Sequence, residues 1–388
     1  MIPYSRQKIY QDDINEVKNI LRSDFLTQGP TVPKFEKAIA DYCGVSYSVA
    51  VNSATSALHI SCLALGLGRG DTLWTSPNSF VASANSALYC GAKVDFVDID
   101  MNTYNISIDA LEEKLIKAKK TNSVPKVVMP VHFAGLPCNM PAIFNLSKKY
   151  GFKILEDASH AIGSSYDKIK IGSCKHSDIA VFSFHPVKII TTAEGGMALT
   201  KEKNIAEKLR KLMNHGITKD KKFFMKRNSK EIWNYQQLIL GYNYRMNDIQ
   251  AALGLSQMKK LDKFIEKRNE IANYYNQKLK TLPIILPKKI LGYCSSYHLY
   301  VIRVPKKKID SQSQKNLYES LLSRNIGVNV HYIPIHRQPF YEKLGFKKGS
   351  FPEAEKLHKE CISLPIYPSL SKLNQFFVTK TLKEIFKK

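Results

Sequence analysis

Short apolar runs alternate with amphipathic stretches along the first half of the chain. The apolar runs are bounded by polar or turn-forming residues, which favours β-strands. The predicted strands are Tyr47–Val51, Thr72–Thr75, Lys93–Val97, Lys126–Met129, Phe152–Leu155, Ile179–Phe184 and Gly196–Leu199. Helical periodicity lies between several of them, as over Ala110–Ala118 and Met140–Tyr150. This alternation predicts an α/β fold, in which a mostly parallel, seven-stranded sheet is covered by helices on both faces.

The pattern changes at both ends of this alternating region. Asp12–Leu21 has helical spacing, with Ile14, Val17, Ile20 and Leu21 on one face. Met246–Lys280 is a long helical pattern with a break, and shorter elements follow it: His298–Val304, Gln314–Arg324 and Val328–Ile333. We therefore expect an N-terminal arm over 1–15, a large domain over 16–245, and a long helix with a small C-terminal α+β domain over 246–388.

The composition suits a large cytoplasmic protein. The chain has 388 residues and is 44% hydrophobic, enough for two domains with buried cores. No window approaches the ~18 to 20 apolar residues of a membrane span, and the first residues contain no apolar signal-peptide core. The seven cysteines are scattered, without a CxxC pair or metal-ligand spacing. We expect reduced thiols, no membrane attachment and no structural metal.

The net charge of +25 raises the question of nucleic acid. The basic residues are spread along the chain, however, and no zinc-finger spacing, RNP-like aromatic cluster or basic heptad region is present. The densest basic segment, Lys201–Lys230, holds eleven Lys and Arg against three acids. A solvated helix and loop explains it best, and the functional alternative is an electropositive approach to an anionic small molecule. Nucleic acid is not an expected partner.

One lysine stands where chemistry is expected. In Asp178–Met197 an apolar strand leads to Ser183 and then Lys188, and the turn-forming Glu194–Gly196 follows. A desolvated lysine loses basicity, and its neutral amine can form a Schiff base with an aldehyde cofactor or a carbonyl substrate. Alone, Lys188 is one of 58 Lys and Arg residues. Its interpretation depends on its neighbours.

Three further groups follow other predicted strands. Ser53–Ser56 opens a helix predicted over Ala57–Leu65 and can bind phosphate through backbone amides or serve as an ordinary N-cap. Asp157 ends a strand one βα unit before Lys188 and can hold a ring nitrogen protonated or cap a helix. Phe80 offers an aromatic platform or a core side chain. Together with the lysine, these groups describe a site for pyridoxal 5′-phosphate (PLP).

At these residues the chain resembles the DegT/DnrJ/EryC1/StrS family of sugar aminotransferases. The motifs run in order from LTQGP (Leu26–Pro30) through NSATSALH, EDASHAIG and SFHPVKIITTAEGG to GYNYRMNDIQAALGLSQMKKL (Gly241–Leu261) and VHYIPIH (Val330–His336). The resemblance implies the type I PLP-dependent aminotransferase fold. Within the family, NSATSAL, SFVASAN, DASHA and SFHPVK are most similar to the enzymes of pseudaminic acid synthesis, which implies amination at C4 of a UDP-linked 4-keto-6-deoxy-N-acetyl-hexosamine by L-glutamate, with release of 2-oxoglutarate.

The resemblance also implies roles for individual residues. Lys188 would hold the cofactor covalently and carry protons, Asp157 would bond the ring nitrogen, and Phe80 would stack on the ring. The remaining cofactor contacts would come from His160 near the ring hydroxyl and from phosphate-binding residues: Ala54, Thr55, Ser183, and Asn243 of the neighbouring subunit. Positions that match nucleotide-sugar contacts are Tyr4, Thr27, Arg245, Asn329, His331 and Tyr332. A homodimer with shared active sites follows from the placement of Asn243.

Several alternatives stay open at this point. The substrate can be a different nucleotide ketosugar, such as a UDP-4-keto-pentose, a GDP-linked precursor of perosamine or a dTDP-3- or 4-keto sugar. The chain can also be a PLP-binding regulator without turnover, or a nucleic-acid-binding protein driven by its charge. A dehydrating branch of the family has histidine at the lysine position. Here Lys188 occupies that position and His185 lies three residues earlier, which argues against dehydration.

Overall fold

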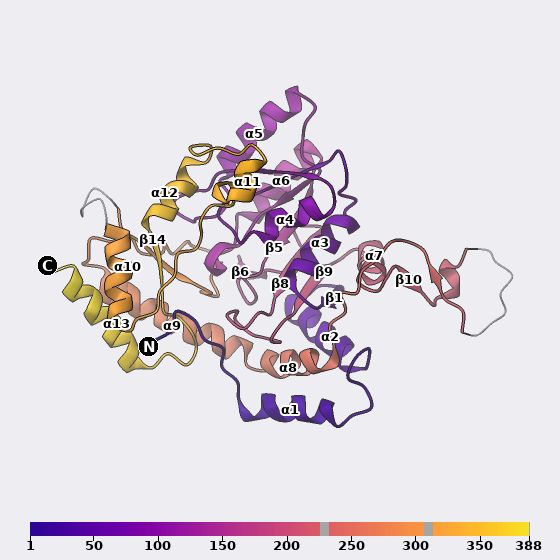
Figure 1. Ribbon diagram of the computed structural model, residues 1–388, viewed down its shortest axis with the longest axis horizontal. Helices are drawn as coiled ribbons and strands as arrows, with labels where there is room; N and C mark the ends of the chain where they lie inside the picture. Colours follow the sequence, from indigo (N-terminus) through magenta and orange to yellow (C-terminus); the bar gives the residue numbers. More distant parts are fainter. Residues whose placement is uncertain (226–232, 306–312, 388) are drawn as a thin grey trace.

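A seven-stranded sheet forms the centre of the molecule in the computed structural model, which describes residues 1–225, 233–305 and 313–387 (Figure 1). The strand order is β1-β9-β8-β5-β4-β2-β3. The strands are β1 Tyr47–Val51, β2 Thr72–Thr75, β3 Lys93–Phe96, β4 Val127–Met129, β5 Lys153–Asp157, β8 Ile179–Ser183 and β9 Gly196–Thr200. β9 runs antiparallel to β1 and β8, while the other pairs are parallel. The predicted strands and the mostly parallel sheet are confirmed.

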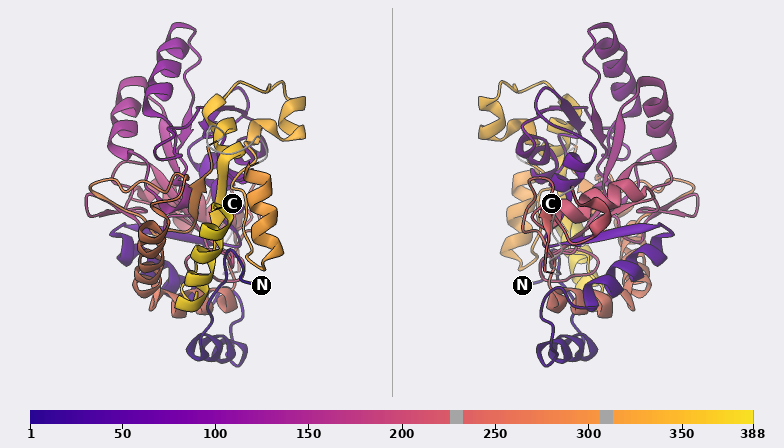
Figure 2. Two further views of the ribbon diagram at one scale, coloured as in Figure 1. Left: turned by 90° about the vertical axis from the view of Figure 1, so that its left-hand side faces the viewer. Right: turned by 90° about the vertical axis from the view of Figure 1, so that its right-hand side faces the viewer.

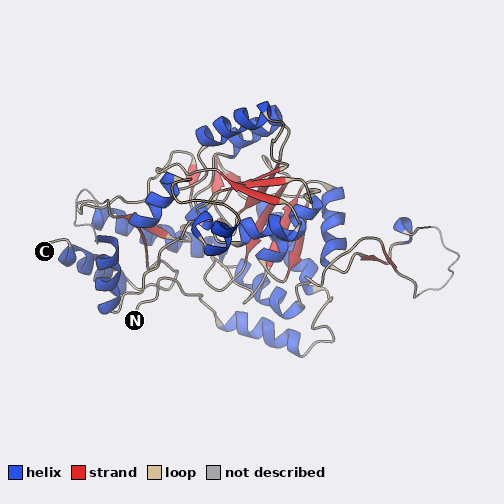
Figure 3. Cartoon of the chain, turned by 45° about the horizontal axis from the view of Figure 1, so that its top comes forward, coloured by secondary structure: helices blue, strands red, loops and turns tan. Residues whose placement is uncertain are grey.

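Helices cover both faces of this sheet (Figure 3). They are α2 Thr31–Cys43, α3 Ala54–Ala64, α4 Ala82–Tyr89, α5 Ile108–Lys120, α6 Met140–Tyr150 and α7 Lys203–Met213. One face packs against α3, α4 and α7 through residues such as Val49 and Val51, and the other packs against α2, α5 and α6 through residues such as Ala50 and Trp74. Because alternate residues of each strand are buried on opposite faces, the strands read as continuous apolar runs.

Capping residues set several helix ends close to the predicted positions. The side chain of Asn139 accepts a hydrogen bond from the backbone of Ala142 and begins α6, and Gly151, at φ 83°, ends it. Ser53 caps α3, which therefore begins three residues before the predicted Ala57–Leu65 helix. The long helical pattern is broken as expected, because two residues separate α8 Asp248–Met258 from α9 Leu261–Leu279.

The C-terminal part has an apolar core of its own. It packs α9 with α10 Ser313–Ser323 and α13 Lys372–Ile385, and with the antiparallel pair β13 Tyr300–Arg303 and β14 Cys361–Leu364. The remaining elements of this part are α11 Pro339–Lys343, α12 Pro352–Glu360 and β12 Tyr293–Cys294. The element predicted over Val328–Ile333 forms no regular strand, since only Asn329 makes a β-bridge there, to Ser363. The domain boundary expected at 245 stays a prediction.

The N-terminal segment crosses to distant parts of the chain. Ile2 forms a parallel bridge with Ile326, where its amide donates to the Asn325 carbonyl (2.8 Å) and its carbonyl accepts from the Gly327 amide (2.7 Å). The helix α1 Gln11–Leu21 then lies against α8, away from the main body in the side views (Figure 2). The segment therefore links both ends of the fold.

The apolar face predicted for α1 is not what attaches it. Ile14 and Leu21 are 51% and 59% exposed. The attachment is polar: the buried Asp13 accepts hydrogen bonds from the side chains of Ser256 (2.5 Å) and Gln257 (2.7 Å). The helix is confirmed, while two of the four residues of its apolar stripe, Ile14 and Leu21, are exposed in the single chain and Val17 and Ile20 are partly buried.

Short strands complete the fold. β6 Ser165–Tyr166 pairs with both β12 and β7 Ile169–Lys170, and β10 Ile217–Thr218 pairs with β11 Gln236–Gln237 in a hairpin that projects from the body (Figure 1). Residues 226–230 of the basic segment Lys201–Lys230 lie outside the described residues. Within the three described ranges, no helix has both the length and the apolar character needed to cross a membrane.

Candidate active site

The expected functional groups gather at one edge of the sheet. Asp157 is the last residue of β5, Ser183 is the last of β8, and Ser53 follows the end of β1. Because β9 is antiparallel, its first residue, Gly196, lies at the same edge and pairs with Ser183. The carboxyl ends of the strands in such sheets form the ligand crevice, and the structure places these groups there.

Lys188 lies in a folded loop between β8 and β9. The loop is held by backbone bonds from Phe184 to Gly195 and from Thr192 to Phe184, both 2.9 Å long. Burial lowers the pKa of Lys188 to about 8, while the negative charge of Asp157 acts in the opposite direction. A lysine with this pKa is neutral in a sizeable fraction of molecules near neutral pH, as nucleophilic and proton-transfer chemistry requires.

Hydroxyl groups hold the carboxylate of Asp157 in place. Ser83 donates to Oδ2 and Ser159 donates to Oδ1, each at 2.6 Å. The Ser83 oxygen lies 2.6 Å from that of Ser79, and because the Ser83 proton is used on Asp157, Ser79 is the donor of this second bond. Asp157 is 5% exposed. The side chain is therefore fixed and has acceptor capacity left for a further donor.

The start of α3 provides unpaired backbone amides. The side chain of Ser53 accepts from the amide of Ser56 (3.1 Å), so the N-cap interpretation is confirmed. Capping by Ser53 leaves the amides of Ala54 and Thr55, which have no acceptor within the helix. These amides and the positive end of the helix dipole suit a phosphate.

Gly196 allows the start of α3 to lie close to β9 of the sheet. A Cβ built on Gly196 would lie 2.5 Å from the Ala54 nitrogen and 2.5 Å from the Ser53 carbonyl carbon. Both atoms belong to the backbone, so no side-chain rotation can relieve the overlap. Only glycine allows β9 and the start of α3 to pack at this distance.

We expect Gly196→Ala to displace the start of α3, because the added methyl overlaps backbone atoms. The variant should lose about 1–3 kcal/mol of stability and bind PLP at least roughly tenfold more weakly, since misplaced amides no longer meet the phosphate. Thermal unfolding and fluorescence titration with PLP measure both effects. Gly68→Ala is the matched control, because a Cβ at Gly68 meets no atom within 4 Å. An unchanged PLP affinity in Gly196→Ala would contradict this role.

Three buried histidines surround Lys188. The rings of His160 and His298 lie 4.3 Å apart between centroids. Burial, followed by the charge of Lys188 among other causes, lowers the pKa of His160 and His331, and that of His331 falls to about 4. Burial and then the neighbouring His160 lower the pKa of His298. All three imidazoles are therefore neutral near pH 7 and act through hydrogen bonds.

The protonation of His160 follows from its contacts. The amide of Ala134 donates to Nδ1 (3.3 Å), so the ring proton is on Nε2. Nε2 lies 3.2 Å from the hydroxyl of Tyr332. Because Nε2 donates to this oxygen, the Tyr332 proton is free to point elsewhere, and burial raises the pKa of Tyr332 so that the proton is retained.

Two more predicted substrate residues join this group. The ring of Tyr4 lies 5.7 Å from that of His331, and the Asn329 side chain lies 3.4 Å from His331 Nε2. Burial raises the pKa of Tyr4, and a hydrogen bond with Asn329 opposes the shift. Four residues predicted from the resemblance thus converge from opposite ends of the chain, the fourth being Tyr332.

The structure leaves the other predicted residues at exposed or separate positions. Phe80 is 60% exposed. Thr27 and Asn243 are exposed and bridge to Asn247 and Asn214, respectively. The Arg245 guanidinium donates to the Asn214 side chain (2.6 Å) instead of reaching the lysine. Within the described part of the single chain, these four residues therefore form no hydrogen bond or ion pair with Lys188 or Asp157.

Sequence reasoning missed His298, Ser83 and Ser159. His298 precedes β13 and has no motif around it, so nothing in the sequence linked it to Lys188. Ser79 and Ser83 lie four residues apart at the start of α4, and two small hydroxyl residues at helical spacing beside a strand end were a usable signal. Ser159 follows Asp157 closely enough to be expected as a local donor.

These groups fit PLP. A lysine amine of lowered pKa, a fixed carboxylate with spare acceptor capacity, orphan amides at a helix start and an exposed aromatic ring match the aldehyde, ring nitrogen, phosphate and ring face of that cofactor. Set on an α/β sheet with a separate C-terminal core, they define a PLP-dependent aminotransferase.

Comparison with known proteins narrows this class. The model of the DegT/DnrJ/EryC1/StrS aminotransferase family matches residues 7–383, so the chain belongs to this family of sugar aminotransferases. A Campylobacter jejuni protein named UDP-4-amino-4,6-dideoxy-N-acetyl-beta-L-altrosamine transaminase is 40% identical over 389 residues, covering 100% of this chain and 98% of its own length.

Solved structures agree with this assignment. Helicobacter pylori PseC, an aminotransferase involved in the biosynthesis of pseudoaminic acid, has a TM-score of 0.90 at 33% identity, covering 100% of this chain and 99% of its own. Bacillus subtilis NtdA, solved with bound pyridoxamine phosphate (PMP), has a TM-score of 0.83 at 28% identity, covering 98% of this chain and 83% of its own. The type I aminotransferase fold and the PLP/PMP cofactor expected from the sequence are confirmed.

Proposed function

We propose that this enzyme transfers the amino group of L-glutamate to C4 of a UDP-linked 4-keto-6-deoxy-N-acetyl-hexosamine. The product is a 4-amino-4,6-dideoxy sugar for pseudaminic acid or a similar surface glycan. The position of the Lys188 amine opposite the carboxylate of Asp157 supports the transamination chemistry. Full-length similarity to the Campylobacter jejuni transaminase supports the choice of sugar.

The proposed mechanism assigns one task to each fixed group. Bound PLP supplies an electron sink for the negative charge that forms beside the nitrogen. The Nζ atom of Lys188 holds the cofactor covalently at rest, and when released it takes the proton from the substrate carbon that bears the nitrogen and later returns one. A carboxylate oxygen of Asp157 keeps a proton on the ring nitrogen. The amides of Ala54 and Thr55, with Ser183, bind the phosphate.

Other residues shape the space next to the lysine. Phe80 would cover one face of the cofactor ring, and His160 would lie near the ring hydroxyl. The remaining substrate contacts are assigned to Tyr4, Thr27, Arg245, Asn329, His331 and Tyr332. The neutral state of His331 suits a hydrogen-bonding role toward a sugar or nucleotide hydroxyl, because its pKa is about 4.

Product analysis tests this function. Purified enzyme is incubated with L-glutamate and UDP-, dTDP- or GDP-linked ketosugars, and the aminated sugar is identified by mass and NMR. We expect a C4 amine on the UDP-linked N-acetyl-hexosamine. If only a dTDP- or GDP-linked sugar is aminated, the proposed UDP-linked substrate is wrong, but the protein is still a nucleotide-sugar aminotransferase. No product from any ketosugar, with PLP bound, would favour a regulator.

We also propose that the enzyme is a cytoplasmic homodimer with shared active sites. Exposed apolar side chains lie on the N-terminal segment and beside the β10–β11 hairpin: Ile14, Leu21, Phe25, Leu26, Trp233 and Leu240. A second copy would cover these side chains and bring its Asn243 to the site. The cysteines are free and mostly buried, as in proteins of reducing compartments.

Subunit complementation tests the shared site. We expect Lys188→Ala and Asn243→Asp to be inactive alone, because one loses the amine and the other adds a charge that repels phosphate. When the two variants are co-expressed with different tags and purified through both, one site of each mixed dimer is intact. Such dimers should recover about half of the wild-type rate. Mixed dimers as inactive as the parents would contradict sharing through Asn243.

A further inference from the structure

Two acidic residues stand side by side at the end of β5. Asp157 faces Ser83 and the active site, whereas Glu156 faces the opposite side of the sheet, as neighbouring residues of a strand do. Glu156 is 3% exposed and its partner His132 is fully buried. Burying a carboxylate away from the reacting atoms costs free energy, so the residues around Glu156 must stabilise its charge.

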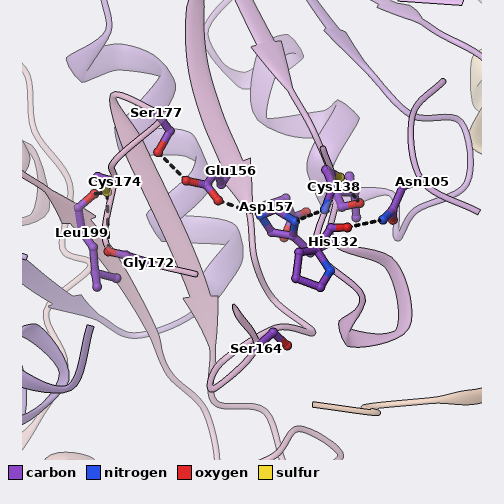
Figure 4. Close-up of polar contacts among 12 residues, drawn as sticks. Asn105, His132, Cys138, Glu156, Asp157, Ser164, Gly172, Cys174, Ser177 and Leu199 are labelled. Carbon is purple, nitrogen blue, oxygen red and sulfur yellow. Dashed lines mark hydrogen bonds and ion pairs between the residues drawn. The ribbon is translucent and has the colours of Figure 1, made fainter. Parts of the chain in front are cut away.

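Both carboxylate oxygens of Glu156 have a hydrogen-bond partner (Figure 4). Its Oε2 lies 2.7 Å from Nε2 of His132, and its Oε1 accepts a short hydrogen bond from the hydroxyl of Ser177. Burial opposes a charge on His132, while Cys138 and Glu156 outweigh it and raise the pKa of the ring to about 10. The amide of Cys138 nevertheless donates to Nδ1 (2.9 Å), so Nδ1 carries no proton in this arrangement and the ring proton is on Nε2. His132 is therefore a fixed donor to the Glu156 carboxylate.

His132 is bonded to Asp157 as well, through its backbone. The amide of His132 donates to the carbonyl of Asp157 (3.1 Å), and the amide of Asp157 donates to the carbonyl of Pro130 (2.9 Å). Asn105 holds the next residue, since its side-chain oxygen accepts from the amide of Phe133 (2.9 Å). One residue thus contacts both acids, Glu156 by its side chain and Asp157 by its main chain.

This double contact sets the register of β5. A slip by one residue would turn every side chain of the strand to the other face, which would send Glu156 toward the cofactor and Asp157 toward His132. Glutamate has one more methylene than aspartate, so its carboxylate would not reach the same place. The contacts of His132 with Glu156 and Ser177 are lost in that arrangement, which disfavours it.

We propose that His132 is a positioning residue, which binds Glu156 on one face of β5 and thereby fixes the Asp157 carboxylate at the cofactor ring on the other face. The inference rests on the proposed role of Asp157. It concerns the accuracy with which that carboxylate is placed, and His132 itself does not touch the substrate or the cofactor.

The main experiment is the substitution His132→Leu, which removes the hydrogen bond to Glu156 and keeps a side chain of similar size. We expect His132→Leu to raise amide hydrogen exchange in the cofactor-free protein over the peptide containing β5, at least roughly tenfold. In the loaded enzyme, kcat should fall on the order of 10- to 100-fold with KM little changed, because a small displacement of a catalytic group has an effect of this size. The visible circular dichroism of bound PLP should also change in this variant.

A second buried histidine–glutamate pair supplies the matched control. Nε2 of His336 lies 2.9 Å from Oε1 of Glu355, and the His336 side chain is fully buried too. His336→Leu should destabilise the fold to a similar degree but leave the exchange of β5, the PLP signal and kcat near wild type. If His132→Leu does not fold, Glu156→Gln is compared with Glu355→Gln in the same assays.

A double variant decides whether His132 acts through Asp157. We expect His132→Leu combined with Asp157→Asn to be no slower than Asp157→Asn alone, because the positioned charge is already gone. Losses that multiply, or a His132→Leu enzyme as fast and as protected in β5 as His336→Leu, would overturn the proposal. A wild-type rate in Asp157→Asn would instead refute the proposed role of Asp157, and the exchange data on the cofactor-free protein still decide whether His132 holds the strand.

Discussion

Lys188→Ala is expected to lower product formation by about 10⁴-fold or more, the largest effect of any single change. The substitution removes both the covalent anchor and the group that moves the proton, and proton transfer alone contributes up to about 10⁴-fold. The loop should keep its shape, because the bond from the Lys188 amide to the His185 carbonyl belongs to the backbone. Amine product is measured by mass spectrometry and folding by thermal unfolding.

Lys188→Arg is the matched control for charge. Arginine keeps the positive charge but stays protonated at any pH of interest, so it can neither bond the cofactor nor accept a proton. It should be as inactive as the alanine variant, while both variants still bind PLP without a covalent bond. Substantial product from either variant would refute the assignment of Lys188.

Asp157→Asn is expected to slow both half-reactions by about 100-fold or more. Asparagine has nearly the same shape but no charge, so it cannot hold a proton on the ring nitrogen, and one pKa unit of lost interaction corresponds to about 1.4 kcal/mol. PLP should stay bound, because its phosphate contacts are unchanged. The first half-reaction is followed by the change of the cofactor absorbance on adding L-glutamate to enzyme in single-turnover amounts.

Asp157→Glu tests whether the rate depends on the negative charge alone or also on the position of the carboxylate. It keeps the carboxylate but extends it past the hydroxyls of Ser83 and Ser159, which lie 2.6 Å from the native oxygens. We expect a rate between those of Asp157→Asn and the wild type. An asparagine variant that runs at the wild-type rate would exclude a role of Asp157 in stabilising charge.

The strands were predictable because both faces of the sheet are buried. In β8, all residues from Ile179 to Ser183 are buried, and the run is apolar at every position up to Phe182 and is bounded by Asp178 and Ser183. The helix α6 has one buried stripe, and Asn139 and Gly151 cap its two ends. The position of β9, next to the edge strand β1, could not be read from its sequence, because an antiparallel strand inside such a sheet has the same composition as a parallel one.

Candidate site residues can be predicted where they lie at the end of a strand, as Asp157 and Ser183 do. His298 and Ser83 were not predicted, because they reach the site through tertiary packing: the His298 ring lies tilted against that of His160, and Ser83 reaches Asp157 from α4. The apolar stripe of α1 was read correctly as helical, yet the periodicity alone cannot say that the docking contact is made by the buried Asp13.

The bridge between Ile2 and Ile326 has a consequence for the order of assembly during translation. The ribosome releases Ile2 at the start of synthesis, but its partner emerges only when most of the chain exists. Tyr4 is brought beside His331 by the same segment. The part of the site that we propose for the sugar therefore forms last, because Tyr4 can pair with His331 only after the C-terminal part of the chain has been made. All the residues that we propose for the PLP phosphate, in contrast, lie before residue 245 and are synthesised earlier.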